Sequence, residues 1–213
     1  MADEAPRVRD PEGTRAAVLE AAERLFAECG FANTSLRDIS SASGVSHPLI
    51  HHHFGSKEGL CQEVKRRLVE SYARKFPEAA RATDQPLDLG DEMRRLVAFI
   101  GDNPVLLRLC AWTRLEGDQQ VWPGEPDVFE TIRRRIEVSQ REKLIRDDLD
   151  PRYLTIVLLG LVFFWLDNRN HFAHRFGPEI NDAEYLRQAV AILERGLAAD
   201  SDQCGATPAP PSA

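Results

Sequence analysis

The sequence contains little cysteine, and its cysteines are not spaced as pairs. The four thiols are Cys29, Cys61, Cys110 and Cys204. A disulfide framework or a cysteine zinc site would need closely spaced pairs, so this distribution favours neither. We expect free thiols in a cytoplasmic protein.

Long hydrophobic runs are also absent. The longest apolar stretch covers residues 154–166, and Thr155 and Gly160 interrupt it. A membrane-spanning helix needs about 20 predominantly apolar residues, so we expect a buried helix here and no membrane partner. The charged and polar N-terminus does not have the pattern of a signal peptide.

The chain lacks an excess of positive charge. Its formal net charge is −7, with 27 Lys and Arg against 34 Asp and Glu. Nonspecific binding to polyanions depends on clustered cations, so that class of function is disfavoured. A sequence-specific reader with few, well-placed cations is compatible with this charge, although acidic residues outnumber basic ones even within residues 1–60.

The sequence shows neither strand-like alternation nor internal repeats, and apolar residues recur at helical spacing, which predicts an all-α fold. We expect a mobile arm at 1–12, a three-helix domain at 13–58, a larger helical domain at 59–198 and a disordered tail at 199–213. In the larger domain, and at its junction with the first, helices are expected at about 56–82, 88–102, 128–143, 151–171 and 182–197.

The stretch 34–58 has the pattern of a helix, a tight turn and a second short helix. Gly44 ends the first helix, where a left-handed residue is needed. Ser46 caps the second helix, and Pro48 lies in its first turn, where no N–H is required. Ile50 is expected to point into the core. This pattern is typical of a helix-turn-helix DNA reader.

The outward positions of the second helix are the candidates for contact with DNA. His47, Leu49 and His51 are the best candidates for contacts to base edges and the groove. His47 and His51 share a face, as metal ligands would, but no third and fourth ligands lie nearby in sequence. We therefore expect no metal here. For the histidine cluster as a whole, which includes His52 and His53, the alternative to DNA contact is a solvated surface.

Residues 14–64 resemble the DNA-binding domain of TetR-type (tetracycline-repressor family) transcriptional regulators. The matching segments are 25–31, 34–39, 44–46 and 53–60. The resemblance implies a homodimer, a palindromic DNA operator and an inducer site in the second domain. It does not imply an enzyme or a cofactor.

The resemblance also implies individual DNA contacts. It places Pro48 in the groove, His53 at the DNA backbone, and Arg37 and Lys57 at positions that meet DNA. In the family the position of Leu49 is usually a small hydroxyl residue and that of His51 a tyrosine, so the operator sequence stays open. The full set of expected contacts is Thr34, Ser35, Arg37, Ser46, His47, Pro48, Leu49, His51, His52, His53 and Lys57. For Arg37 the alternative is a surface ion pair with Glu28 or Asp38.

Two features of the larger domain suggest an interface and a pocket. The last two helices are apolar on several sides, and they could form half of an intersubunit four-helix bundle, where the family dimerises. A pocket for an unknown small-molecule effector would lie among the preceding helices. Its candidate lining residues are Phe99, Arg108, Trp112, Phe163 and Arg169, each with core packing or an ordinary surface arginine as the alternative.

Two alternatives to a ligand-responsive repressor remain open. Asp167, His171 and His174 have a spacing that suits a metal, which would allow a metal-dependent enzyme, although an ordinary helix end explains them as well. The acidic first domain would also suit a helical interaction module with weakened DNA binding. The run 133–135, Arg-Arg-Arg, is expected to be a solvated helix face and not a nucleic-acid patch.

Overall fold

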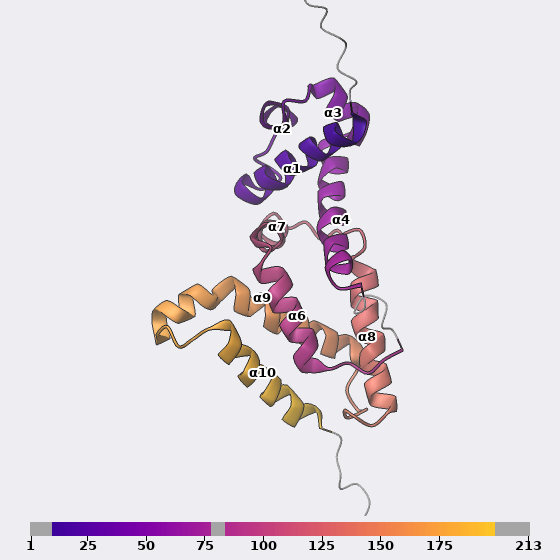
Figure 1. The fold of residues 1–213 in the computed structure, drawn as a ribbon, viewed down its shortest axis with the longest axis vertical. Coiled ribbons are helices and arrows are strands. Elements are labelled where there is room, and N and C mark those ends of the chain that lie inside the picture. The colour runs from indigo at the N-terminus through magenta and orange to yellow at the C-terminus, as the bar shows by residue number, and fades with distance from the viewer. Residues whose placement is uncertain (1–9, 78–83, 199–213) are drawn as a thin grey trace, which may run out of the picture. The chain divides into compact units, whose positions relative to one another are not determined.

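The computed structural model describes residues 10–77 and 84–198, and all regular elements within them are helices (Figure 1). The predicted all-α fold is confirmed. The helices are α1 (Pro11–Cys29), α2 (Leu36–Ser43), α3 (His47–Phe54), α4 (Lys57–Lys75), α6 (Leu89–Gly101), α7 (Pro104–Leu115), α8 (Glu125–Arg141), α9 (Pro151–Phe176) and α10 (Asp182–Leu197). The predicted tail and residues 1–9 of the predicted arm lie outside the described residues.

The chain divides into two compact units. Unit 1 comprises Met1–Ala79 and Phe99–Val128, and unit 2 comprises Ala80–Ala98 and Phe129–Ala213. Helices α1 to α4 and α7 therefore belong to one body, whereas α9 and α10 belong to the other. The two units are therefore interleaved along the chain, because α7 packs against the N-terminal helix α1.

The core of unit 1 is built from one side of each N-terminal helix. A set of apolar side chains from α1 to α4 is at most 1% exposed, and burial of each Val, Leu, Ile or Phe among them stabilises the fold by about 1.5–3 kcal/mol. The fully buried members are Val18, Ala22, Phe26, Ile39, Ile50, Leu60 and Val64. Ile50 faces inward as predicted, so the opposite face of α3 is left for a partner.

Helix α4 is shorter than the sequence pattern suggested. The expected helix ran to residue 82, but α4 ends at Lys75, and Phe76 has a non-helical backbone with φ −130° and ψ 64°. Pro77 explains the difference, because a proline disfavours helical backbone at the residue before it. Similarly, α8 begins three residues earlier than expected, and α9 continues to Phe176 instead of ending near His171.

Helix α7 is hydrogen-bonded to the end of α1. The Ala27 carbonyl accepts hydrogen bonds from Arg108 Nε at 2.8 Å and from Trp112 Nε1 at 3.2 Å. Gly30, which ends α1, has φ +82° and lies so close to α7 that a Cβ there would be 2.8 Å from the Trp112 ring. A glycine is therefore required at this junction for two reasons, its backbone conformation and the space available.

Unit 2 contains a buried ion cluster that corrects one expectation. The run 133–135 was expected to be solvated, but the Arg135 side chain is only 8% exposed and donates from Nη1 to Glu92 Oε2 at 2.8 Å. Glu92 is itself 2% exposed and also accepts from Arg95 at 2.6 Å. Helical periodicity placed one of the three arginines on the inner face, where a carboxylate from α6 neutralises it.

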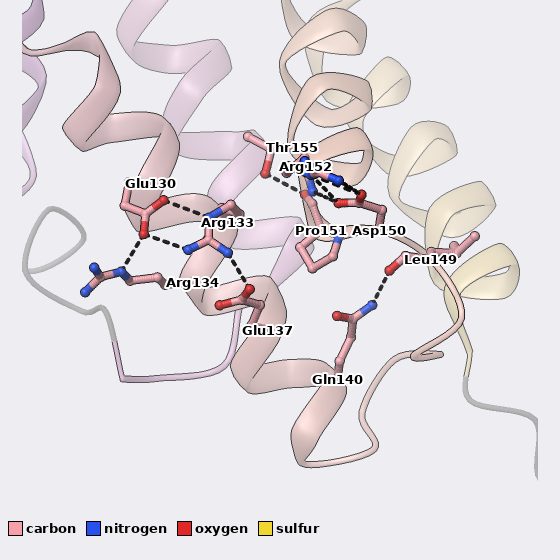
Figure 2. A network of polar contacts seen from close by, with 10 residues as sticks. All are labelled: Glu130, Arg133, Arg134, Glu137, Gln140, Leu149, Asp150, Pro151, Arg152 and Thr155. Carbon is pink, nitrogen blue, oxygen red and sulfur yellow. Dashed lines mark hydrogen bonds and ion pairs between the residues drawn. The ribbon is translucent and has the colours of Figure 1, made fainter.

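Of the other two arginines of this run, Arg134 is exposed and Arg133 is half-buried, and Figure 2 shows both beside Glu130. Glu130 accepts from Arg133 and from Arg134, at 2.7 Å in each case. These contacts hold the Glu130 pKa down at about 2, with the Arg133 hydrogen bond as the main cause. The same view shows Gln140 on α8 donating to the Leu149 carbonyl at 2.7 Å, which anchors the loop before α9.

Helix α9 combines buried and exposed apolar faces. Trp165 stacks on Tyr185 of α10 with ring centroids 4.3 Å apart, whereas Ile156 and Phe164 are 64% and 58% exposed. Among the described residues no single helix has the length and composition to cross a bilayer, and the α6–α7 pair meets that test only as a bent pair. The apolar run that the sequence placed at residues 154–166 is thus part of a helix that is half covered by its own chain.

Candidate nucleic-acid interface

The start of α2 is closed by reciprocal hydrogen bonds. Ser35 Oγ accepts from the Asp38 N–H at 3.2 Å, and the Asp38 carboxylate accepts from the Ser35 N–H at 2.9 Å. This capping box satisfies two backbone donors that the helix itself leaves unpaired. The Ser35 hydrogen bonds also lower the Asp38 pKa, so this carboxylate stays ionised. Ser35 is exposed, but its hydroxyl already serves the helix.

The turn between α2 and α3 has the predicted glycine conformation, but the predicted Ser46 cap is wrong, because the Ser46 side chain makes no cap hydrogen bond. Gly44 adopts the left-handed conformation, with φ +67° and ψ 14°. Ser40 Oγ donates to the Val45 carbonyl at 2.6 Å, which ties the turn back to α2. Ser46 precedes α3 without a side-chain cap, and its carbonyl accepts from the Ile50 N–H at 3.0 Å. Two short helices are thereby held at a defined angle with little freedom in the turn.

Helix α3 presents a polar face to solvent. His47, Pro48, His51 and His52 are exposed, while Leu49 and His53 are half-buried. No residue of α3 carries a carboxylate, so nothing on the helix itself repels phosphate. Imidazoles can donate or accept hydrogen bonds and carry positive charge when protonated. The structure therefore brings the expected reading residues onto one small, exposed surface, here called the α3 face and consisting of these six residues.

Lys57 is engaged within the protein. Its ammonium donates to the carbonyls of Phe31 at 2.9 Å and Thr34 at 3.0 Å. The same nitrogen lies 4.1 Å from the centroid of the Phe31 ring, in a cation–π arrangement. An ammonium has three donors, so one is left to meet a phosphate. Lys57 thus positions the loop before α2 in addition to any contact it makes with DNA.

Thr34 has an internal role. It is only 3% exposed, and its hydroxyl donates to the Gly30 carbonyl at 2.8 Å. A buried hydroxyl cannot reach a phosphate without leaving this bond, so we assign Thr34 to the fold of the α1–α2 loop and leave it out of the proposed DNA surface.

Two arginines flank the α3 face. Arg37 is exposed at the start of α2, and its charge is a minor cause of the lowered Asp38 pKa, after the Ser35 hydrogen bonds. Arg15 of α1 forms an ion pair with Glu63 and lies 5.4 Å from the centroid of the Phe54 ring. Sequence reasoning did not identify Arg15, because its contact with the end of α3 joins positions far apart in the chain.

The residues predicted to line an effector pocket fall in both units. Phe99, Arg108 and Trp112 belong to unit 1, and Phe163 and Arg169 to unit 2. Phe99 packs edge-on against Tyr72 at 5.2 Å. Trp112 and Arg108 share the Ala27 carbonyl, and Trp112 also lines a cavity.

Of the unit 2 residues, Phe163 is half-buried. Arg169 pairs with Asp182 at 2.6 Å and borders an open hollow near the start of α10. Both arginines of the predicted set therefore have partners within their own unit.

The end of α9 carries the residues of the alternative metal site. Within the described residues, no group of three or more His, Cys, Asp and Glu side chains is arranged to hold a metal ion. His171 and His174 are exposed at the last turns of α9. His171 makes a ring contact with Phe172 at 5.7 Å.

Comparisons with known proteins agree with this geometry. The family described as bacterial regulatory proteins, tetR family, matches residues 18–64, and a tetracyclin repressor-like C-terminal domain family matches residues 88–195. The HTH-type transcriptional repressor NicS of Pseudomonas putida is 26% identical over 90% of this chain and 95% of its own length. The HTH-type transcriptional repressor Rv3405c of Mycobacterium tuberculosis is 31% identical over 72% of each chain.

Solved structures show the same fold. The regulator SCO4942 of Streptomyces coelicolor superposes with a TM-score of 0.70 at 21% identity, covering 87% of this chain and 99% of its own. GusR of Salmonella enterica gives a TM-score of 0.68 at 21% identity, covering 90% and 98%. The helix-turn-helix head and the helical second unit are those of a DNA-binding transcription factor. The chain belongs to the TetR family of transcriptional regulators.

Proposed function

We propose that this protein is a ligand-responsive repressor that binds a palindromic operator as a homodimer. The observation that carries the proposal is the α3 face, a set of exposed and half-buried residues without a carboxylate, held by the Gly44 turn at the edge of the helical core of unit 1. Family membership supports the general class, a DNA-binding transcriptional regulator.

The α3 face enters the major groove. His47 and His51 lie one turn apart on α3 and contact base edges, while Pro48 and Leu49 supply apolar contact within the groove. His52 and His53 at the helix end, together with Arg37 and Lys57, face the phosphates. Ser46, which precedes α3, and Ser35, which precedes α2, offer further polar contacts to the backbone.

Dimerisation involves α9 and α10. Exposed apolar side chains recur along α9 at spacings of three, four and seven residues, and another lies on α10, so α9 carries an apolar stripe that needs a partner. They are Tyr153, Ile156, Val157, Phe164 and Ile192. Pairing these side chains about a two-fold axis gives a four-helix bundle. On a palindrome, the two α3 helices of such a dimer read half-sites about one DNA turn (~34 Å) apart.

Effector binding shifts the population between a DNA-competent dimer and one with a different spacing of its reading helices. The side chains proposed to meet the effector are those of unit 1, Phe99, Arg108 and Trp112. An effector that displaces Arg108 or Trp112 from the Ala27 carbonyl would alter the attachment of α7 to α1. That contact therefore links a bound effector to α1, which packs against the helix-turn-helix.

The test is selection of bound fragments from a sheared genomic library, followed by sequencing. The variant carries H47A and H51A, and the matched control carries H171A and H174A, two exposed histidines of α9. We expect wild type and control to enrich one palindromic motif and the α3 variant to lose it. A folded wild-type dimer that enriches no motif, with and without cell extract, would refute the proposal and favour a helical interaction module.

A further inference from the structure

Unit 1 contains a cavity that the DNA-binding role does not use. It has a volume of about 300 Å³ and lies between the end of α1, the first turns of α4, and α7 with the loop that follows it. This volume is at the lower end of the range for small-molecule sites. All of its lining residues belong to unit 1, so the cavity lies within that unit and does not involve unit 2.

Part of the cavity lining is aromatic and apolar. Phe31, Trp112, Leu109 and Cys61 all line it, and Leu109 and Cys61 are 3% and 7% exposed. Trp112 is held in place because its indole N–H donates to the Ala27 carbonyl at 3.2 Å. The ring therefore presents a fixed face to whatever enters, without a loss of rotamer freedom on binding.

Another part of the lining carries surplus negative charge. Lys65 is 3% exposed, and its ammonium lies 2.6 Å from Asp118 Oδ2, so these two charges compensate each other. Glu58 and Glu116 also line the cavity. Hydrogen bonding to the α4 backbone lowers the Glu58 pKa, which keeps that carboxylate ionised.

Glu116 lies at the rim nearest the tryptophan. Its Oε1 accepts from the Ala32 N–H at 3.0 Å, which leaves Oε2 to meet a ligand. A Cβ placed on Gly30 would be 2.7 Å from Glu116 Oε1 and 2.8 Å from Trp112, so carboxylate and ring meet at one point. Lys57 covers the Phe31 ring, which directs a ligand's positive charge away from Phe31 and toward Trp112.

We propose that this cavity binds a small organic cation, an ammonium group attached to a flat or aliphatic body. The ammonium lies over Trp112 and between the carboxylates of Glu116 and Glu58, where cation–π attraction and charge pairing act together. The body packs on Leu109 and Cys61. The site shares Trp112 with the effector residues proposed above, and binding of the cation does not depend on dimerisation or on DNA.

Isothermal titration calorimetry of the full-length protein tests the proposal. The probe is 1-naphthylmethylammonium, compared with the anion 1-naphthylacetate and the neutral 1-naphthylmethanol. The variant carries E58Q and E116Q, and the amide introduced by E116Q keeps an oxygen for the Ala32 N–H. The matched control carries E20Q and E142Q, the same change of charge at exposed positions that do not line the cavity. Thermal melting checks that all variants are folded.

We expect wild type and control to bind the cation with equal affinity and the cavity variant to bind about tenfold more weakly. Single E116Q should move in the same direction, which keeps the test informative if the double variant is unstable. The anion and the alcohol should bind wild type at least tenfold more weakly than the cation. Equal binding by the cavity variants, equal binding of the anion, or no binding of the cation by wild type would overturn the proposal.

Discussion

The junction between α1 and α7 can be tested by adding one methyl group. Gly30 and Gly44 both have positive φ, at +82° and +67°. They differ in surroundings, because a Cβ on Gly44 would meet nothing within 4 Å. On Gly30 it would lie 2.8 Å from Trp112 and 2.7 Å from Glu116. Comparing G30A with G44A therefore separates the cost of the backbone conformation from the cost of the collision.

The expected magnitudes follow from these two terms. An alanine in the left-handed region at Gly44 costs about 1–2 kcal/mol. Gly30 has ψ 168°, outside the left-handed helical region, and a non-glycine residue there costs about 1–3 kcal/mol. The Glu116 carboxylate can rotate away, but the Trp112 ring is anchored at Ala27, so the overlap adds roughly 1–3 kcal/mol. We expect G30A to lose about 2–6 kcal/mol in the free energy of unfolding.

Urea denaturation followed by circular dichroism, at one protein concentration for all three proteins, measures this difference. G30A should have its midpoint at clearly lower urea than G44A, which should itself lie below wild type. If G30A is as stable as G44A, then α7 does not pack against Gly30 as described. That result would also remove the geometric basis for placing Glu116 beside Trp112 in the cation cavity.

Two further predictions concern buried groups. Replacing Arg135 by methionine removes one guanidinium partner of the buried Glu92 carboxylate, which keeps its contact with Arg95, and should cost about 1.5–3 kcal/mol in the free energy of unfolding, whereas R134M, at an exposed pair, should cost less than about 1 kcal/mol; equal losses in urea denaturation would contradict the buried ion pair. Burial raises the pKa of the Cys61 thiol to about 11, so at pH 8 roughly one thiol in a thousand is the reactive thiolate. Iodoacetamide followed by peptide mass spectrometry should therefore modify exposed Cys29 in the native protein and Cys61 only after denaturation. Equal native labelling rates would show that Cys61 is not buried as described.

Local sequence was sufficient to predict the helix-turn-helix. A left-handed turn favours glycine, so Gly44 could be assigned from its neighbours alone. Periodicity likewise placed Ile50 inside. Each of these assignments depends on atoms within a few residues of each other, which is why no three-dimensional information was needed. The expected Ser46 cap of α3 was wrong, because the local pattern does not fix whether the side chain makes that hydrogen bond.

The roles of several charged and polar residues could not be read in this way. Lys57 was expected at the DNA and is held by carbonyls 23 and 26 positions earlier in the chain. Arg135 was expected in solvent, and its partner Glu92 is 43 positions away. The Thr34 hydroxyl has a closer partner, but its burial depends on how the α1–α2 loop packs.

The difference lies in the range of the forces that decide each feature. Steric limits on φ and ψ and the unpaired N–H groups of a helix start act within one turn of chain, so the sequence alone determined the helices and the helix-turn-helix. Whether an ammonium or guanidinium is buried depends on which carbonyls and carboxylates the folded chain brings to it, because a charge leaves water only for compensating partners. Only the tertiary structure decided those partners, and with them the cavity beside Trp112.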